Sequence, residues 1–252
     1  MSSAKRLMPG YLTAGPTPSG PASLGMKWHD LLFAHWPMPV EALRSLLPST
    51  NPALELDTFQ GEAWIGVVPF RMSGIRLRGC PPIPGTAAFP ELNVRTYVRA
   101  NGRTGVWFFS LDAASWLAVR AARISFHLPY FDAVMACERD EGWIRYASRR
   151  QHRRDGIAEL TVRYCPTGPV FQGEAGSLED WLTARYRLFA ADRRGKLWRG
   201  EIQHEPWPLQ RAQAEFTTLD MVRWLGLELP VTTPHLLYSR CLAVQAWRLL
   251  DA

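Results

Sequence analysis

The feature that most constrains the fold is a series of short alternating segments separated by turn residues. In Glu91–Arg99, the side chains of Leu92, Val94, Thr96 and Val98 fall on one face of a strand, and the mainly polar and charged ones fall on the other. Asn101-Gly102 favours a tight hairpin turn, after which Val106–Leu111 returns as a second strand. Because such segments recur at hairpin spacing, the pattern predicts antiparallel strand pairing.

The rest of the chain extends this pattern. Further strands are expected at residues 62–70, 133–138, 143–149, 157–164, 185–190, 197–204, 212–216 and 236–249. Short helices are expected at residues 39–47, 113–122 and 218–225, and after Ser177, which opens a capping-box-like sequence. Strands do not alternate regularly with helices, as they would in a parallel sheet. The sequence therefore predicts an α+β fold, with a mostly antiparallel, β-barrel-like core and a few short helices.

Composition suggests one folded domain behind a tail. Residues 1–25 are rich in Pro, Gly, Ser, Thr and Ala and predict a flexible N-terminal tail, whereas residues 26–252 are expected to form a single domain. The 47% share of hydrophobic residues excludes a mostly disordered chain. We find no apolar run near the ~20 residues of a membrane span and no signal-peptide core, so we expect a cytoplasmic protein.

The net charge of +6 is carried almost entirely by arginine, since lysine occurs only at Lys5, Lys27 and Lys196. The densest basic cluster, within residues 149–154, precedes Asp155-Gly156 and is interpreted as a solvated hairpin tip. Nucleic-acid contact is the alternative, but the cluster lacks an aromatic platform or a recognition helix. We therefore expect no nucleic-acid partner and no membrane association, while a homo-oligomer stays open.

Several motifs of known chemistry are absent from the sequence. The chain has no GxGxxG or P-loop segment, no GxSxG nucleophile motif and no HExxH metal motif. Its four cysteines lack CxxC spacing and a neighbouring histidine pair, so we expect free thiols and no zinc site (Cys80, Cys137, Cys165 and Cys241). The sequence gives no argument for a metal or an organic cofactor.

Several segments of the chain are specific when they are taken together, although each alone would be weak. They are Phe33–Pro37, Leu56–Phe59, Trp64–Met72, Glu91–Val98, Gly105–Asp112, Leu128–Tyr130 and Glu201–Leu209. Through these segments the chain resembles, from Trp28 to Trp247, the YqjF-like bacterial family of unknown function.

That family is similar in turn to acetoacetate decarboxylase. Glu41–Pro48 looks like an early helix of the decarboxylase, and Arg185–Leu188 looks like a later barrel strand. Phe89-Pro90-Glu91 looks like the segment that carries an active-site glutamate, and Arg123–Phe131 looks like the segment that carries the Schiff-base lysine. The resemblance implies a closed, mostly antiparallel barrel with a buried polar cavity.

The chain departs from this pattern where the chemistry of the decarboxylase requires a lysine. Two adjacent lysines follow a proline in the decarboxylase, whereas this chain has Pro129-Tyr130-Phe131. A Schiff base needs a primary amine, which neither tyrosine nor phenylalanine supplies. We therefore predict that the chain does not catalyse lysine-dependent decarboxylation, and whether it is an enzyme at all stays open.

Polar residues on predicted strands define a candidate ligand site. Glu91 and Arg95 lie on one strand face with Asn93, so a structural ion pair between Glu91 and Arg95 is one interpretation. In the other interpretation these residues line a cavity, where Arg95 and Arg123 bind a ligand carboxylate in a bidentate manner. Glu91 and Tyr130 then orient the ligand, and Trp107 or Phe109 form walls. The candidate ligand-binding residues are Glu91, Asn93, Arg95, Arg123, Tyr130, Arg185, Tyr186 and His204.

Three functions are compatible with these residues. The first is a protein that binds a small carboxylate-bearing molecule in a barrel cavity. The second is a lyase- or hydrolase-type enzyme on a small keto or carboxylic acid, which uses Glu, Arg and Tyr or His204 without a Schiff base. The third is an arginine-rich protein associated with nucleic acid. We expect the first.

Overall fold

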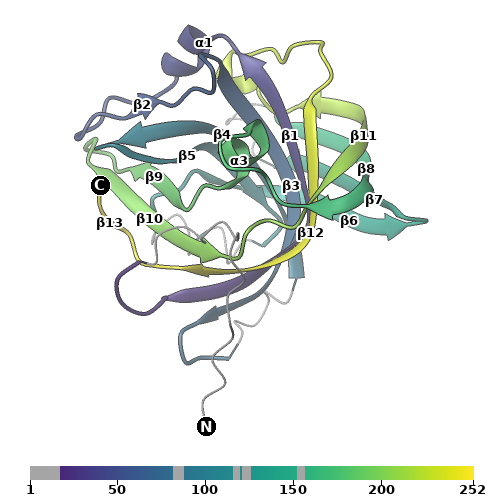
Figure 1. Cartoon of the computed structure of the whole chain (residues 1–252), viewed down its shortest axis with the longest axis horizontal. Coiled ribbons are helices and arrows are strands. Elements are labelled where there is room, and N and C mark those ends of the chain that lie inside the picture. Colours follow the sequence, from purple (N-terminus) through teal and green to yellow (C-terminus); the bar gives the residue numbers. More distant parts are fainter. Residues whose placement is uncertain (1–17, 82–87, 116–119, 121–125, 152–156) are drawn as a thin grey trace.

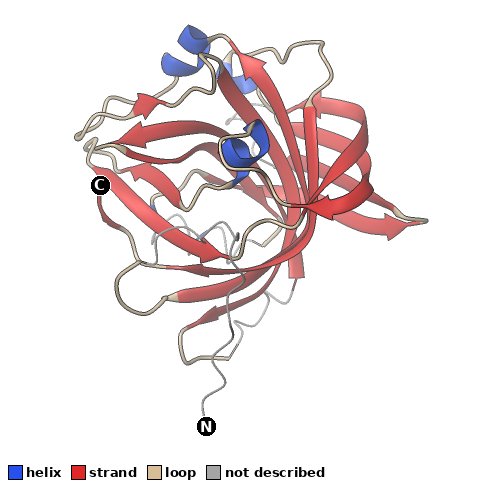
Figure 2. Ribbon diagram, viewed as in Figure 1, coloured by secondary structure: helices blue, strands red, loops and turns tan. Residues whose placement is uncertain are grey.

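The computed structural model describes residues 18–81, 88–115, 120, 126–151 and 157–252, and strands dominate this part of the chain (Figure 2). The first strands are β1 (Leu24–Met38), β2 (Glu55–Leu56), β3 (Ala63–Leu77), β4 (Ala88–Ala100) and β5 (Arg103–Ala113). They are followed by β6 (Tyr130–Asp140), β7 (Trp143–Arg150), β8 (Glu159–Phe171), β9 (Arg187–Ala191), β10 (Leu197–His204), β11 (Leu209–Asp220), β12 (His235–Ala246) and β13 (Leu250–Asp251). The predicted α+β class with a barrel-like, mostly antiparallel core is confirmed.

The strand pairings close into two rings that share five strands. The larger ring runs β1-β3-β4-β5-β6-β7-β8-β11-β12 and returns to β1, and we call it the large ring. The small ring runs β1-β3-β4-β5-β9-β10-β12 and also returns to β1. Figure 1 shows β1, β3 and β12 together in the middle, with β9 and β10 on one side and β6, β7, β8 and β11 on the other. Only β5–β6 and β5–β9 are parallel among the strand pairs of the described residues.

The shared strands are buried on both faces because a ring closes over each face. Leu32 and Ala34 of β1 pack in a core with Ile144 and Tyr146 of β7, which lies inside the large ring. Their neighbours Leu31 and Phe33 pack in a second core, with Ala190 of β9 and Trp207, inside the small ring. The alternation of residues 31–34 of β1 thus divides their side chains between two interiors.

A backbone irregularity at Asp30 adjusts this alternation. Asp30 has a left-handed φ of 53° and lies at a break of register between β1 and β3. A regular strand would place Trp28 and Phe33, five residues apart, on opposite faces. Both instead contact Trp207, at ring-centroid distances of 5.9 and 4.9 Å. The irregularity therefore adds the indole of Trp28 to the small-ring interior.

The short helices partly match the sequence predictions. Helix α1 (Val40–Arg44) lies within the predicted residues 39–47, and α3 (Leu178–Thr183) begins as expected, because the Ser177 hydroxyl accepts a hydrogen bond from the Asp180 amide. The helix predicted at 218–225 is wrong in its first half: β11 continues to Asp220, and only a 3-10 turn, Arg223–Leu225, follows. Of the helix predicted at 113–122, residue 113 ends β5 and most of the rest lies outside the described residues.

The ends of the chain are only partly described. Residues 1–17 of the expected tail lie outside the described residues, while β1 begins at Leu24, slightly before the predicted boundary at residue 26. The division into a tail and a single domain stays a prediction. Within the described residues, no helix has the length and apolar character to span a membrane. All four cysteines are free thiols, and two of them are exposed.

Candidate functional site

A strip of polar side chains on β4 faces the small ring. Glu91, Asn93 and Arg95 pair across β3 with Phe70, Val68 and Gly66. Glu91 and Asn93 retain only 3% and 6% exposure, and Arg95 is partly buried. The opposite face of β4 carries apolar side chains that pack in the large ring. The predicted division of β4 into two faces is thus present, and its polar face points inward.

Glu91 is paired with Tyr130, the first residue of β6. The Tyr130 hydroxyl donates to the Glu91 carboxyl group, at 3.3 Å from each oxygen. Burial raises the pKa of Glu91 to about 8, and the nearby negative charge of Asp112 contributes to the rise, whereas the Tyr130 hydrogen bond opposes it. At neutral pH Glu91 is therefore mostly a neutral carboxylic acid that can donate a proton.

Arg95 has no acidic partner among the described residues. Its Nη2 donates to the Tyr97 hydroxyl at 3.2 Å and to the Leu182 carbonyl at 3.1 Å, and its buried Nε has no hydrogen-bond partner there. The interpretation of Glu91 and Arg95 as an ion pair is therefore wrong. Four residues along a strand separate two Cα atoms by about 13 Å, and each side chain is held by another neighbour instead. The small ring thus contains a guanidinium that no carboxylate of the described residues neutralises.

His35 of β1 completes the surroundings of Arg95, and the sequence analysis missed it. Its Nε2 lies 2.7 Å from the Tyr97 hydroxyl, and its ring lies over Gly66, where a Cβ atom would stand only 2.7 Å from Nε2. Phe33 packs beside both groups: its ring centroid is 6.0 Å from that of His35 and 5.3 Å from the Arg95 Cζ. The glycine therefore makes the space that His35 occupies.

His204, the last residue of β10, lies among aromatic rings. It retains 4% exposure and packs against Tyr186 and Trp207, with ring centroids 4.8 and 5.0 Å away. Its Nδ1 bonds to the Glu205 carbonyl at 2.7 Å, and its Nε2 is buried without a partner among the described residues. Burial lowers the pKa of His204, although the Glu205 bond opposes this. His204 is therefore neutral near pH 7.

Arg185 is held by protein groups. Its Nη1 donates to Asp57 at 2.8 Å and its Nε to the Trp181 carbonyl at 2.6 Å, and the guanidinium packs on the Trp181 and Tyr97 rings. Asp57 also binds Arg99, so this carboxylate joins two arginines. Arg185 thus has an acidic partner, which it shares with Arg99, whereas Arg95 has none among the described residues, although Nη2 of Arg185 is also buried without a hydrogen-bond partner there.

Three further residues named from the sequence are not placed beside Arg95 by the described part of the structure. Arg123 lies outside the described residues. Trp107 and Phe109 do not form walls beside Arg95, because Arg95 pairs with Phe108 across β5, so the two neighbours of Phe108 point to the other face. The polar side chains of the small ring therefore form separate contacts, namely the Glu91–Tyr130 pair, the Arg95–His35–Tyr97 group and the His204–Tyr186 contact, with Asn93 on the same strand face as Glu91 and Arg95.

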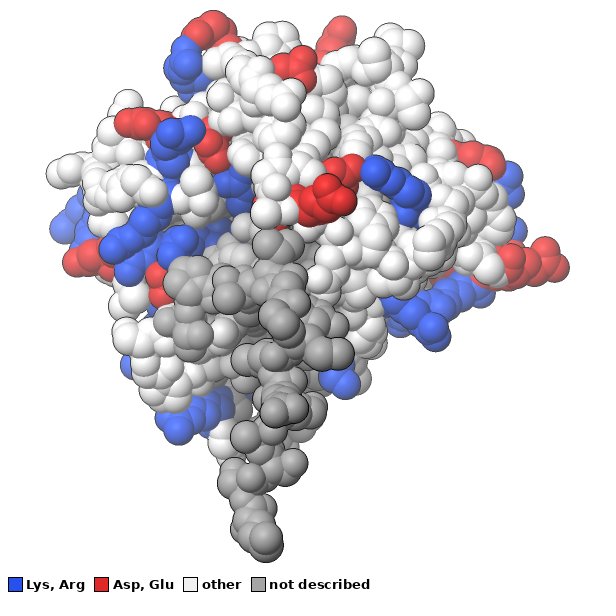
Figure 3. Space-filling view, in the orientation of Figure 1, with Lys and Arg blue, Asp and Glu red and all other residues white. Residues whose placement is uncertain are grey.

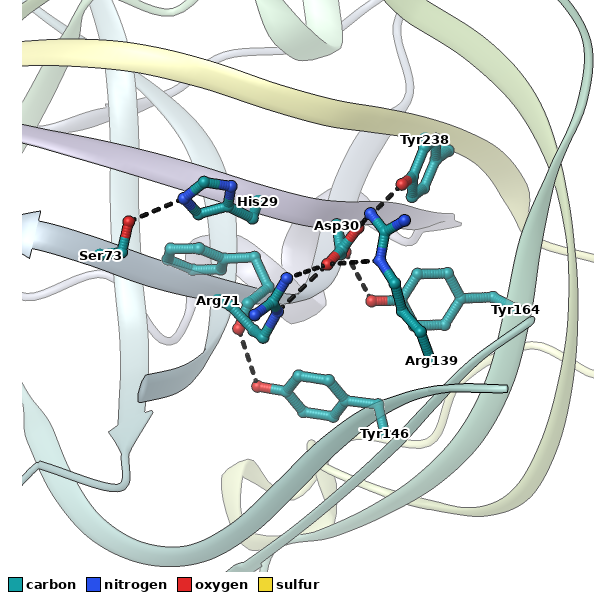
Figure 4. A network of polar contacts seen from close by, with 9 residues as sticks. His29, Asp30, Arg71, Ser73, Arg139, Tyr146, Tyr164 and Tyr238 are labelled. Carbon is teal, nitrogen blue, oxygen red and sulfur yellow. Dashed lines mark hydrogen bonds and ion pairs between the residues drawn. The ribbon is translucent and has the colours of Figure 1, made fainter. Parts of the chain in front are cut away.

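The acidic groups of the large ring, in contrast, are paired. Asp30 is fully buried and receives hydrogen bonds from Arg71, Arg139 and Tyr238, which Figure 4 shows converging on its carboxylate. Burial alone would raise the pKa of Asp30, but these three donors lower it below its ordinary value. Nearby, the Tyr164 hydroxyl donates to the Asp30 carbonyl at 2.5 Å. Such a satisfied network has the character of a structural element.

The basic cluster within residues 149–154 is only partly a solvated tip. Arg149 is exposed, but Arg150 points inward, binds Asp112 through two hydrogen bonds of 2.7 and 2.9 Å, and stacks on Phe131. The prediction is wrong for Arg150 because the alternation of β7 continues to its last residue. Residues 152–154 lie outside the described part of the chain. On the face drawn in Figure 3, basic and acidic groups of the described residues are interspersed.

The described lysines lie away from the polar strip. Lys27 is exposed on β1, and Lys196 pairs with Asp251 at 2.7 Å at the surface. Lys5 is outside the described residues. Within the described ranges, no group of three His, Cys, Asp or Glu side chains is placed to hold a metal ion.

Comparisons with known proteins show which family this chain is similar to. A family model, DUF2071, described as an uncharacterized conserved protein, matches residues 25–243. The chain is 45% identical over 232 residues to the uncharacterized protein YqjF of Bacillus subtilis (strain 168), which covers 92% of this chain and 93% of YqjF.

Solved structures of low sequence identity share the fold. The enduracididine biosynthesis enzyme MppR, solved in complex with pyruvate, matches with a TM-score of 0.63 at 13% identity, over 92% of this chain and 91% of MppR. Acetoacetate decarboxylase from Legionella pneumophila subsp. pneumophila str. Philadelphia 1 matches with a TM-score of 0.60 at 13% identity, over 99% and 92%. The chain therefore belongs to the YqjF-like DUF2071 family of uncharacterized proteins and has an acetoacetate-decarboxylase-like fold.

Proposed function

We propose that this protein binds a small carboxylate-bearing molecule inside the small ring, with Arg95 as the group that binds the carboxylate. The observation that carries the proposal is the Arg95 guanidinium, which is partly buried and has no acidic partner among the described residues. Burying an uncompensated charge is costly, so such a group favours an anionic ligand. A carboxylate also matches the planar donor arrangement of a guanidinium.

The surroundings support a small organic anion. Phe33 lies against Arg95, and Trp207, Trp28 and Phe70 extend an apolar wall along the same interior. A few polar groups among aromatic side chains are typical of sites for small molecules. The pyruvate complex of MppR, a protein of the same fold, supports an acid of this size.

Calorimetric titration with a panel of small acids tests the proposal. Pyruvate, lactate, 2-oxobutyrate and gluconate are titrated into the wild type and into Arg95→Met. We expect at least one acid to bind and its affinity to fall about 10- to 100-fold in the variant, since a charge-assisted hydrogen bond contributes about 1.5–3 kcal/mol. Arg163→Met is the matched control, because Arg163 pairs with Glu215 on the outer surface. Equal affinities of both variants would refute the role of Arg95.

A second candidate function, acid–base catalysis on a small keto acid, is favoured by Glu91. A carboxyl group with a pKa of about 8 holds its proton at neutral pH and releases it slightly above. In its ionised form Glu91 would take a proton from the carbon next to the keto group, and the electron pair of the broken C–H bond would form an enolate. The enolate would then regain a proton from the Glu91 carboxylic acid.

Hydrogen exchange measures this step directly. In D₂O, proton NMR follows the loss of the methyl signal of pyruvate as deuterium replaces hydrogen. We expect the protein-catalysed rate to increase as the pH rises through about 8, because the base form of Glu91 then accumulates, and to vanish in Glu91→Gln. An exchange rate that the substitution leaves unchanged would leave ligand binding as the function.

Neither candidate uses a Schiff base. We expect that borohydride treatment with a β-keto acid gives no covalent adduct by intact-mass spectrometry, since the two described lysines lie at the surface. An adduct on any lysine would contradict the proposal.

We further propose that the protein acts in the cytoplasm, without a nucleic-acid or membrane partner. Acidic and basic groups are interspersed on the face drawn in Figure 3, which supports the absence of a nucleic-acid partner. A salt-dependent shift of DNA or RNA in an electrophoretic assay would contradict it.

A further inference from the structure

Two buried histidines present a nitrogen without a proton to the small ring. In His204, Nδ1 lies 2.7 Å from the Glu205 carbonyl, which can only accept, so Nδ1 carries the proton. The other nitrogen, Nε2, then has a lone pair. It is buried and has no hydrogen-bond partner among the described residues.

The proton positions around Tyr97 show that His35, too, has one ring nitrogen without a proton. The Tyr97 hydroxyl lies 2.9 Å from the Leu182 carbonyl, and an O···O contact of this length needs the phenol proton between the two atoms. The Tyr97 oxygen therefore accepts from His35 Nε2 at 2.7 Å and from Arg95 Nη2 at 3.2 Å. Because His35 uses its one proton on Nε2, its Nδ1 has a lone pair, which is buried and unpartnered among the described residues.

The side chains of His35 and His204 both remain hydrogen-bond acceptors at neutral pH. His35 is fully buried, and this burial lowers its pKa well below the ordinary value, with the positive charge of Arg95 and the neighbouring His235 acting in the same direction. Burial also lowers the pKa of His204. The Oδ1 atom of Asn93 is a third buried acceptor without a partner among the described residues. A carboxylate or a keto oxygen cannot satisfy these atoms, because it has no hydrogen to donate.

We propose that the ligand of the small ring is a hydroxy acid. This inference rests on the proposed function: Arg95 binds the carboxylate, and a nearby hydroxyl donates to His35 Nδ1, since both residues bind the same Tyr97 oxygen. His204 lies beyond Phe33 and Trp207 and accepts from a second hydroxyl of a longer ligand. An amino acid fits less well, because its ammonium would lie beside the positive charge of Arg95.

Matched pairs of acids test the inference by calorimetry. Lactate and pyruvate share a carbon skeleton, and only lactate has a hydroxyl hydrogen. We expect lactate to bind about fivefold more tightly, the factor of one neutral hydrogen bond. His35→Phe should abolish this preference. His35→Asn, whose amide oxygen can replace Nδ1, should retain it. His29→Phe is the control on the same strand, since His29 Nε2 is bonded to Ser73.

Longer and uncharged probes separate the remaining outcomes. His204→Phe should weaken the binding of gluconate and leave the affinity for lactate unchanged. His204→Gln should bind gluconate as the wild type does. If pyruvate binds the wild type as tightly as lactate does, the inference is overturned while an effect of Arg95→Met still supports the proposed function. If Arg95→Met has no effect but His35→Phe abolishes binding of lactamide, the proposed function fails and the donor requirement stands.

Discussion

Replacing Glu91 with glutamine should change how the stability of the protein depends on pH. The pKa of Glu91 is about 8 in the folded state, compared with an ordinary value of 4.5, mainly because the carboxyl group is buried. Between these two values the folded protein keeps the Glu91 proton and the unfolded chain has released it. The contribution of this proton to stability is therefore complete below about pH 4.5 and is lost as the pH rises through about 8.

The magnitude follows from the length of that interval. Each pH unit in which only the folded state holds the proton changes the free energy of unfolding by about 1.4 kcal/mol. Between pH 5 and about 8, the wild type should therefore lose about 4 kcal/mol of stability through Glu91 alone. This is a large part of the roughly 5–15 kcal/mol by which domains are usually stable.

Urea denaturation of the wild type and Glu91→Gln at several pH values between 5 and 9 measures the effect. Glutamine has no proton to release, and the other titrating groups contribute almost equally to both proteins. We therefore expect the difference in unfolding free energy to shift by about 4 kcal/mol in favour of the variant as the pH rises. Parallel curves over this range would show that Glu91 has an ordinary pKa and would refute its proposed acid–base role.

Three further substitutions test the structure around the site. Asp112→Asn removes the carboxylate that binds the buried Arg150 guanidinium through two hydrogen bonds and should cost about 3–5 kcal/mol in urea denaturation. Gly66→Ala places a methyl group 2.7 Å from the His35 ring, so it should cost about 1–3 kcal/mol and also reduce lactate affinity by calorimetry. Ser177→Ala removes a helix cap and should lower stability by about 1 kcal/mol, without an effect on lactate binding.

The two faces of β4 could be predicted because alternation is a local property. A strand places successive side chains on opposite sides whatever its neighbours are, so Glu91 and Asn93 had to share a face. The sequence did not show that both faces are buried, since that depends on the closure of two rings by β9 and β10 on one side and β6 to β8 on the other. An alternating strand more often has one face in water.

Residues of the site that depend on distant contacts could not be predicted in the same way. His35 lies in an apolar run on β1, and its role depends on Tyr97 and Gly66, which are far away in the sequence. The only signal for it was its place in Phe33–Pro37, one of the segments that carry the family resemblance. Arg150, in contrast, could have been predicted, because the alternation of β7 already placed it inward.

The shared sheet also explains why the polar face of β4 indicates a ligand. In the large ring, Asp30 and Asp112 have arginine partners, so their burial is compensated within the protein. In the small ring, Arg95 has no acidic partner among the described residues. His35 and His204 each have a buried ring nitrogen without a hydrogen-bond partner there. A fold that satisfies buried charges on one side of a sheet has no structural need for an unsatisfied set on the other. The two interiors therefore differ in how their buried charges are paired, and this difference points to a ligand that supplies the missing anion.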